Sequence, residues 1–156
     1  MIVLTGQCHC GAVRAVFKTA REPGAIPVRA CQCGFCRRHG AATASDPEGR
    51  LRLDVRRPLK RYRFGAEAIE MLLCPQCGVY VAAVLETGQG LLATLNVAGL
   101  AMAPLDATPP TPVDYGGESE DARRTRRLAA WTPITIAETS PCPAHDAANT
   151  ATFPVA

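Results

Sequence analysis

The sequence predicts a mainly β protein, and three observations carry this prediction. Apolar residues alternate with charged ones in short runs, most clearly at Leu51, Leu53 and Val55. Turn-forming glycine, proline and aspartate residues separate these runs. No stretch before Val97 repeats its apolar residues with a helical period. A chain of 156 residues is long enough to build a core, so we expect one β domain.

The expected strands follow one another along the chain. In order they cover residues 12–17, a short segment around Val28, and residues 51–55, 59–64, 68–73, 79–85 and 91–97. Gly65 marks a turn between the fourth and the fifth of these strands. The tetrapeptide Thr87-Gly88-Gln89-Gly90 is typical of a hairpin between the last two. The body of the protein up to Val97 is therefore expected to be all-β.

The composition changes after Gly99. The prolines of residues 103–113 predict an extended connector that lies over the surface and not inside a sheet. Within residues 118–127 the acidic side chains precede the arginines, which is the order that the helix dipole favours. We expect one short helix there, ending before Pro133. The expected divisions are 1–102 for the β domain, 103–136 for the connector and helix packed on or beside it, and 137–156 for a flexible tail.

The N-terminus and the hydropathy bear on the compartment. The chain has no apolar run of about eighteen residues, the length that a membrane-spanning helix needs. The first residues reach Gly6 too early to form a signal peptide. We therefore expect a cytoplasmic protein with no membrane partner. In that reducing compartment, clustered cysteines indicate metal ligands more than disulfides.

Two of the cysteine motifs form a natural pair. Cys8 and Cys10 make a C-x-C motif, and the distant Cys74 and Cys77 make a C-x-x-C motif that follows a strand. Together they supply four thiolates, which is the ligand set of a closed structural zinc site. The free energy of metal binding at such a site is on the order of 10 kcal/mol, so we expect this zinc to be needed for folding.

A third motif leaves Cys31, Cys33 and Cys36 as a set of three thiolates. Structural zinc sites have four protein ligands, whereas catalytic sites keep one position for water or substrate. We interpret this set as a second, open zinc site with a catalytic role. Two alternatives remain: His39 or a remote group completes a purely structural site, or the three thiols bind no metal and are redox-active.

Three thiolates make the metal a weak Lewis acid, so an open site of this kind suits a thiol better than a water molecule. A bound thiol would lose its proton near neutral pH and could then add to an electrophilic carbon. Arg37 and Arg38 follow the motif directly, and they could bind a substrate carboxylate or be solvated. The formal charge of +3 would be cancelled by seven thiolates and two zinc ions, which argues against a nucleic-acid partner.

The order of these motifs resembles one known family. The motifs are Gly6-x-Cys8-x-Cys10-Gly11-x-Val13, Cys31-x-Cys33-x-x-Cys36-Arg37-Arg38 and Cys74-x-x-Cys77-Gly78. They resemble the glutathione-dependent formaldehyde-activating enzyme family, which includes centromere protein V, over roughly residues 6–97. The resemblance implies a β-tent of packed antiparallel sheets, a structural zinc on the first and third motifs and a labile zinc on the second. Residues 100–131 do not resemble the usual C-terminal part of the family, and we expect substrate contacts beyond the metal there.

The resemblance also implies carbon-sulfur lyase chemistry, the reversible joining of glutathione to formaldehyde. We therefore expect a zinc-dependent enzyme that activates a small, glutathione-like thiol at Cys31, Cys33 and Cys36 for addition to an aldehyde. The alternative is a non-catalytic module in which both zinc ions are structural and the arginines address a protein or nucleic-acid partner. Its motivation is Arg37, Arg38 and the arginines of residues 123–127.

Overall fold

The computed structural model describes residues 1–139, and it is mainly β, as predicted. The strands are β1 (Ile2–Gln7), β2 (Val13–Thr19), β3 (Arg29–Cys31), β4 (Thr43–Ala44), β5 (Arg50–Val55), β6 (Lys60–Tyr62), β7 (Glu70–Leu73), β8 (Tyr80–Thr87), β9 (Gly90–Asn96), β10 (Thr111–Val113) and β11 (Thr132–Glu138). The helices are α1 (Gly34–Arg38) and α2 (Glu120–Ala130), and two short 3-10 helices are η1 (Pro23–Ala25) and η2 (Leu105–Ala107). The expected flexible tail lies, from residue 140 on, outside the described residues.

All eleven strands belong to one hydrogen-bonded sheet, which runs in the order β1-β2-β5-β11-β9-β4-β3-β10. A branch leaves this path at β9, where β8, β7 and β6 follow one another. Most pairs are antiparallel, but β11 runs parallel to β5 and β10 runs parallel to β3. Both parallel strands come from the part of the chain after Gly99. The expectation that residues 103–113 stay outside the sheet is therefore wrong for β10, which pairs with β3 at the end of the sheet, where an edge strand tolerates proline.

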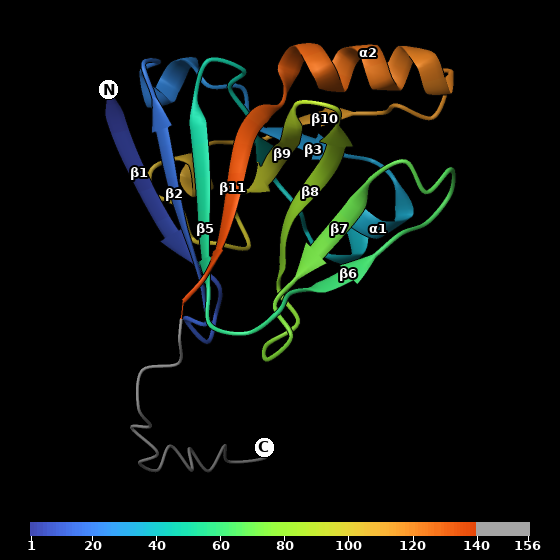
Figure 1. The fold of residues 1–156 in the computed structure, drawn as a ribbon. Coiled ribbons are helices and arrows are strands. Elements are labelled where there is room, and N and C mark those ends of the chain that lie inside the picture. The colour runs from blue at the N-terminus through green and yellow to red at the C-terminus, as the bar shows by residue number, and fades with distance from the viewer. Residues whose placement is uncertain (140–156) are drawn as a thin grey trace, which may run out of the picture.

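The sheet divides into two wings that meet at β11 (Figure 1). We call β1, β2 and β5 the first wing, and β6, β7, β8 and β9 the second wing. The start of β11 pairs with β9 through residues 132–134, and its remainder pairs with β5 through residues 134–138. The sequence analysis did not predict this strand, and Ala137 and Glu138, which we expected in the tail, belong to it.

The first strand was also not predicted, because the edge position leaves most of its side chains exposed. Leu4 alone is buried in β1, so the apolar alternation is too weak to recognise. Gly6 brings this strand close to the chain that follows β9. A Cβ atom at Gly6 would lie 2.5 Å from the carbonyl oxygen of Leu100, so the approach requires glycine.

Two apolar clusters fill the molecule. The larger one lies between the wings and includes Phe17, Leu53 and Leu95, each with at most 2% of its surface exposed. The smaller one gathers Tyr80 and Trp131 with other side chains around one of the cysteine motifs. The body of the second wing therefore separates a structural core from a smaller cluster that borders the candidate site.

Helix α2 lies across one end of the sheet, above the strands of the second wing (Figure 1). The side chain of Ser119 caps it by accepting a hydrogen bond from the N–H of Ala122 at 3.2 Å. The guanidinium of Arg126 pairs at 2.9 Å with Glu118, which precedes the first residue of the helix. No helix within residues 1–139 is both long enough and apolar enough to cross a membrane.

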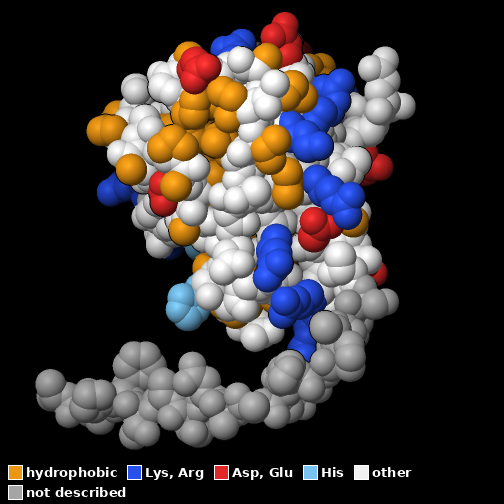
Figure 2. All heavy atoms as spheres, turned by 90° about the vertical axis from the view of Figure 1, so that its left-hand side faces the viewer, with side chains coloured by type: hydrophobic (Ala, Val, Ile, Leu, Met, Phe, Trp, Pro, Cys, Tyr) orange, Lys and Arg blue, Asp and Glu red, His pale blue; other side chains and the backbone are white. Residues whose placement is uncertain are grey.

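The outer face of the first wing carries a line of basic side chains (Figure 2). The exposed members from β2 and β5 include Arg14, Lys18 and Arg52. Asp54 pairs with Arg52 at 2.7 Å, and further acidic side chains interrupt the line in the same view. This mixed, solvated surface gives little support to a dedicated polyanion site.

Candidate metal centres

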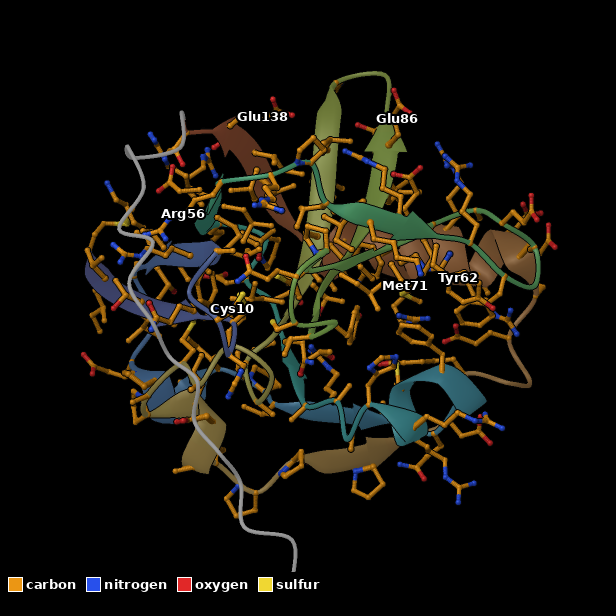
Figure 3. The ribbon with its side chains drawn as sticks, turned by 90° about the horizontal axis from the view of Figure 1, so that it is seen from below. Cys10, Arg56, Tyr62, Met71, Glu86 and Glu138 are labelled. Carbon is orange, nitrogen blue, oxygen red and sulfur yellow. The ribbon has the colours of Figure 1, made fainter. Side chains whose placement is uncertain are left out.

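The first and third cysteine motifs meet in space, as expected for a shared site. The turn between β1 and β2 supplies Cys8 and Cys10, and the turn between β7 and β8 supplies Cys74 and Cys77. All four sulfur atoms lie within 4.8 Å of one another. We call this group the four-cysteine cluster. It joins the tips of the two wings, and Figure 3 shows Cys10 beneath the first wing.

The sulfur spacing of this cluster fits a tetrahedral metal site. The sulfur atoms of Cys8 and Cys10 are 3.7 Å apart, and those of Cys10 and Cys74 are 3.6 Å apart. A zinc ion with four sulfur ligands at about 2.3 Å separates them by about 3.8 Å. The donor set and its geometry are therefore consistent with zinc.

The two turns that hold these cysteines are built alike. In each, the backbone N–H of the first cysteine donates across the turn, from Cys8 to Val13 at 3.0 Å and from Cys74 to Val79 at 2.9 Å. A glycine follows the second cysteine of each motif, and its φ is positive: 72° for Gly11 and 74° for Gly78. Glycine adopts this left-handed conformation without steric cost, which explains its place in both motifs.

The remaining motif forms a second group, which we call the three-cysteine cluster: Cys31, Cys33 and Cys36. Cys31 ends β3, and Cys33 caps α1, its sulfur accepting a hydrogen bond from the N–H of Cys36 at 3.4 Å. Cys36 lies inside this helix and is 5% exposed. The sequence analysis did not predict α1, because five residues are too few to show a helical period.

No histidine or acidic residue of the described chain joins the three-cysteine cluster within 4.8 Å. His39, the first candidate for a fourth ligand, is exposed, and its ring packs against the ring of Phe35 with centroids 4.4 Å apart. The three-cysteine cluster therefore brings together three sulfur atoms that could hold a metal ion, with no fourth histidine, cysteine or carboxylate from residues 1–139 beside them.

Cys31 and Cys36 of this cluster differ in how readily they lose their protons. The hydrogen bond with Cys36 lowers the pKa of Cys31 to about 6. The same interaction, together with burial, raises the pKa of Cys36. Without a metal the cluster therefore carries a thiolate at Cys31 at neutral pH, which is the form that binds a metal ion.

The three-cysteine cluster borders a cavity of about 290 Å³. The lining comes from β3, α1, β4, the loop between β6 and β7, β7, β8, β9, the loop after β10, α2 and the residue that follows α2. It comprises Arg29, Cys31, Cys33, Cys36, Thr43, Phe64, Ile69, Met71, Tyr80, Ala83, Thr94, Asp114, Tyr115, Gly116, Arg123, Arg126, Ala130 and Trp131. Figure 3 shows Met71 at β7, a strand of the second wing, away from Cys10. The cavity is mostly apolar and aromatic, as small-molecule sites usually are.

A buried amide holds the backbone at Tyr80, one of the residues that line this cavity. Asn96 accepts the N–H of Ala42 through Oδ1 at 3.2 Å and donates Nδ2 to the carbonyl oxygen of Tyr80 at 2.9 Å. These bonds connect the segment after α1 with the start of β8.

Burial raises the pKa of Tyr80, so its phenol keeps its proton at neutral pH. The ring of Phe35 meets the ring of Tyr80 edge-on, with centroids 5.1 Å apart.

The cavity also contains residues that the sequence analysis did not select. Arg29, Arg123 and Arg126 line it, whereas Arg37 and Arg38 are exposed on α1 and are not part of the lining. Contact of that pair with a substrate stays a prediction. The sequence did contain a signal for Arg29: it precedes Cys31 by two positions, and alternate residues of a strand point to the same side. The two arginines of α2 lie in the segment where we expected substrate contacts.

Comparison with known proteins agrees with this arrangement. The family model described as glutathione-dependent formaldehyde-activating enzyme matches residues 3–113. The chain belongs to the glutathione-dependent formaldehyde-activating enzyme family. The match spans all three cysteine motifs of this family member, and it ends before α2. The predicted membership is thus confirmed.

A solved structure supports the same fold. The crystal structure of a Rhodobacter sphaeroides protein is 30% identical in sequence to this family member and superposes with a TM-score of 0.53. The similarity covers 70% of the present chain and 99% of the other. No curated protein matches the sequence. The family is therefore shown, and the substrates of this member have to be argued from its own site.

Proposed function

We propose that this protein is a zinc-dependent carbon-sulfur lyase that joins a small thiol, such as glutathione, reversibly to an aldehyde such as formaldehyde. The observation that supports this most is the position of three cysteines beside a cavity. Within residues 1–139 no fourth protein donor lies beside them. The cavity beside the cluster holds about 290 Å³, which gives room for an external thiol and a small aldehyde.

Each cysteine group has its own proposed role. Cys8, Cys10, Cys74 and Cys77 hold a structural zinc ion, because four thiolates leave no position for a substrate. Cys31, Cys33 and Cys36 hold a second zinc ion and are the catalytic set. A zinc ion bound there would lower the pKa of the substrate thiol. The cytoplasm is the proposed compartment, because the cysteine ligands and the substrate thiol stay reduced there.

The chemical step transfers no electrons between molecules. The sulfur of the thiol forms a bond with the aldehyde carbon, the carbon-oxygen double bond becomes single, and the thiol proton ends on that oxygen. The product is an S-hydroxymethyl thioether when the aldehyde is formaldehyde. Tyr80 lines the cavity and keeps its phenol proton, so it can donate a hydrogen bond to the oxygen as negative charge develops there. The apolar lining keeps bulk water from competing with the thiol.

The first test is a count of metal ions and bound thiol by native mass spectrometry, with and without glutathione. We expect two zinc ions and one thiol in the native protein. Cys33→Ser should lose one zinc ion, the thiol and all turnover with glutathione and formaldehyde, while the circular dichroism spectrum stays native. Cys142→Ser, which changes the cysteine outside the three motifs, is the matched control and should behave as the native protein does.

Two outcomes would contradict the proposal. Full turnover by Cys33→Ser would remove the three-cysteine cluster from the reaction. A native protein with two zinc ions that binds no thiol would favour the non-catalytic module, in which both metals are structural.

Arg37 and Arg38 are tested in the same assay, since a role in binding substrate predicts a higher KM in their methionine variants.

A further inference from the structure

Arginines predominate among the charged side chains of the cavity beside the three-cysteine cluster. These side chains, apart from the cysteines, are Arg29, Asp114, Arg123 and Arg126. Arg126 is neutralised by Glu118, to which it donates hydrogen bonds of 2.9 to 3.1 Å. Asp114 is exposed and turns back on its own loop, where its Oδ1 accepts the N–H of Gly116 at 2.8 Å. The other two arginines remain to be explained.

Arg29 is half-buried, and among the described residues it has no carboxylate partner within 4.0 Å. It precedes Cys31 by two positions in β3, and alternate side chains of a strand point to the same side. The guanidinium and the Cys31 thiol therefore face the same space. A half-buried arginine without a counter-ion beside a ligand-binding cluster is well placed for an anion that enters the cavity.

Arg123 approaches the cavity from α2. One terminal nitrogen donates to the carbonyl oxygens of Tyr115 and Gly116, at 3.1 and 3.3 Å, which fixes the guanidinium without neutralising it. Its Nε is buried and has no hydrogen-bond partner within residues 1–139. A buried donor without an acceptor is rare in folded proteins, and here it lies in the wall of a cavity. The missing acceptor is naturally supplied by a ligand.

We propose that Arg29 and Arg123 form an anion subsite that binds a carboxylate of the thiol substrate. The substrate class is then a thiol that carries a carboxylate within a few bonds of its sulfur. This inference rests on the proposed function, because the three-cysteine cluster is what places the sulfur. The cavity of about 290 Å³ is near the lower end of the range of small-molecule sites, about 300–1,000 Å³, which favours a compact acid.

The position of Arg123 makes this subsite a property of the present chain. Helix α2 begins at residue 120, whereas the family model matches residues 3–113. The thiol site is therefore built from the shared part of the fold, and one half of the anion subsite is built from the C-terminal part. Specificity for the acid group would then differ among proteins that share the cysteine motifs.

The chain contains a natural reporter for a test. Trp131 is its single tryptophan, it is 7% exposed, and it lines the same cavity. The zinc-loaded protein is titrated with 3-mercaptopropionate and with its neutral amide, 3-mercaptopropionamide, while the tryptophan fluorescence is followed. We expect the acid to bind roughly tenfold more tightly than the amide or better, because a charge-assisted pair of hydrogen bonds is lost with the amide.

The variants Arg29→Met and Arg123→Met should each weaken binding of the acid by roughly tenfold and leave binding of the amide unchanged. Arg124→Met is the matched control, since this exposed arginine on α2 does not line the cavity. Arg29→Lys keeps the charge without the two-pronged geometry and should fall between the methionine variant and the native protein. The comparison of acid with amide in the native protein does not depend on how any variant folds.

Three results would overturn the subsite. Equal affinity of the native protein for the acid and the amide would agree with the thiol site but show that the two arginines do not bind the carboxylate. Equal weakening of both ligands in the methionine variants would mean that the arginines only balance the charge of the metal cluster. If no thiol binds, the proposed function itself fails. Propionate separates that case, because the subsite alone predicts that propionate quenches the tryptophan and that Arg29→Met abolishes the effect.

Discussion

Cys33 shows how one side chain connects the fold with the site. Its sulfur accepts the N–H of Cys36 at 3.4 Å and so caps the short helix α1, and it is also one of the three sulfur atoms of the three-cysteine cluster, the proposed metal ligands. Serine and aspartate are the usual residues at such a cap, because their oxygen is a better acceptor. A sulfur in this place is explained by the metal cluster. Cys33→Ser therefore removes a ligand while keeping a cap, which makes it a clean test of the metal.

The ionisation of Cys31 gives a prediction about the protein whose three-cysteine cluster has been emptied by a chelator. The pKa of this thiol is lowered to about 6 by the hydrogen bond with Cys36. A lowered pKa means that the reactive thiolate is present at lower pH, so alkylation of Cys31 by iodoacetamide should rise through about pH 6 and level off by about pH 7.5. Peptide mass mapping across this range measures the reaction residue by residue.

Cys36 serves as the internal control for that experiment. It is buried, and its pKa is raised by the same hydrogen bond and by burial, so it should stay unmodified over the same range. A rate at Cys31 that rises about tenfold for each unit of pH between about pH 6 and pH 8, and levels off only near pH 9, would show an ordinary thiol and contradict the expected cluster.

At the scale of elements, the sequence was informative where one face of a strand is buried. β2, β5, β8 and β9 overlap the predicted segments, because their apolar residues repeat with period two or form long apolar runs. The last two form the predicted hairpin, joined through Thr87 and Gly90. The helix α2 was found from its charge order, although none of its residues is buried and its apolar pattern is weak.

The missed elements lacked a local signal. β1 lies at the edge of the sheet, α1 has five residues, and β11 begins with Thr132 and Pro133, which resemble a helix stop more than a strand. In the site, the cysteine groups could be sorted from spacing alone, whereas Arg123 could not be placed. Its position depends on where α2 lies across the sheet, and only tertiary structure fixes that.

The junction of β11 with the loop before β5 gives a prediction of stability. Thr132 is 1% exposed, and its hydroxyl accepts the N–H of Asp46 at 2.8 Å. Thr132→Val keeps the shape and removes the acceptor, which leaves a buried N–H without a partner. We expect the free energy of unfolding to fall by about 1 to 3 kcal/mol, measured by urea denaturation.

Thr135→Val is the control for this variant, because Thr135 lies on the same strand and is exposed. A valine there suits a β-strand and should change stability by less than about 0.5 kcal/mol. If the two valine variants lose stability equally, the hydrogen bond to Asp46 does not hold β11 in place. The carboxylate of Asp46 also accepts the hydroxyl of Thr19 at 2.6 Å, so this junction ties β2 into the same network.

For the whole molecule, the two cysteine groups have different proposed roles, one in stability and the other in chemistry. The four-cysteine cluster joins turns of the two wings, and its members Cys10 and Cys74 are 64 positions apart in the chain. A metal ion that closes so long a loop would stabilise the folded state, because it would bind the folded arrangement of the cysteines and not the unfolded chain. The three-cysteine cluster joins residues only a few positions apart and ties no distant strands together.

This division predicts two different responses to the loss of one thiol. Cys10→Ser removes a ligand that spans the wings, and metal binding at such sites contributes on the order of 10 kcal/mol, comparable with the stability of a whole domain. We expect this variant to be largely unfolded by circular dichroism and to bind no zinc at the four-cysteine cluster. Cys33→Ser should keep the native spectrum and a melting temperature within a few degrees of the unmodified protein.

A chelator added to the native protein should reproduce both results in sequence, with loss of one zinc ion before any change in the spectrum and unfolding only on loss of the second. Simultaneous release of both ions with unfolding would show that the clusters depend on each other, and equal melting of the two variants would deny the four-cysteine cluster its role in holding the wings together.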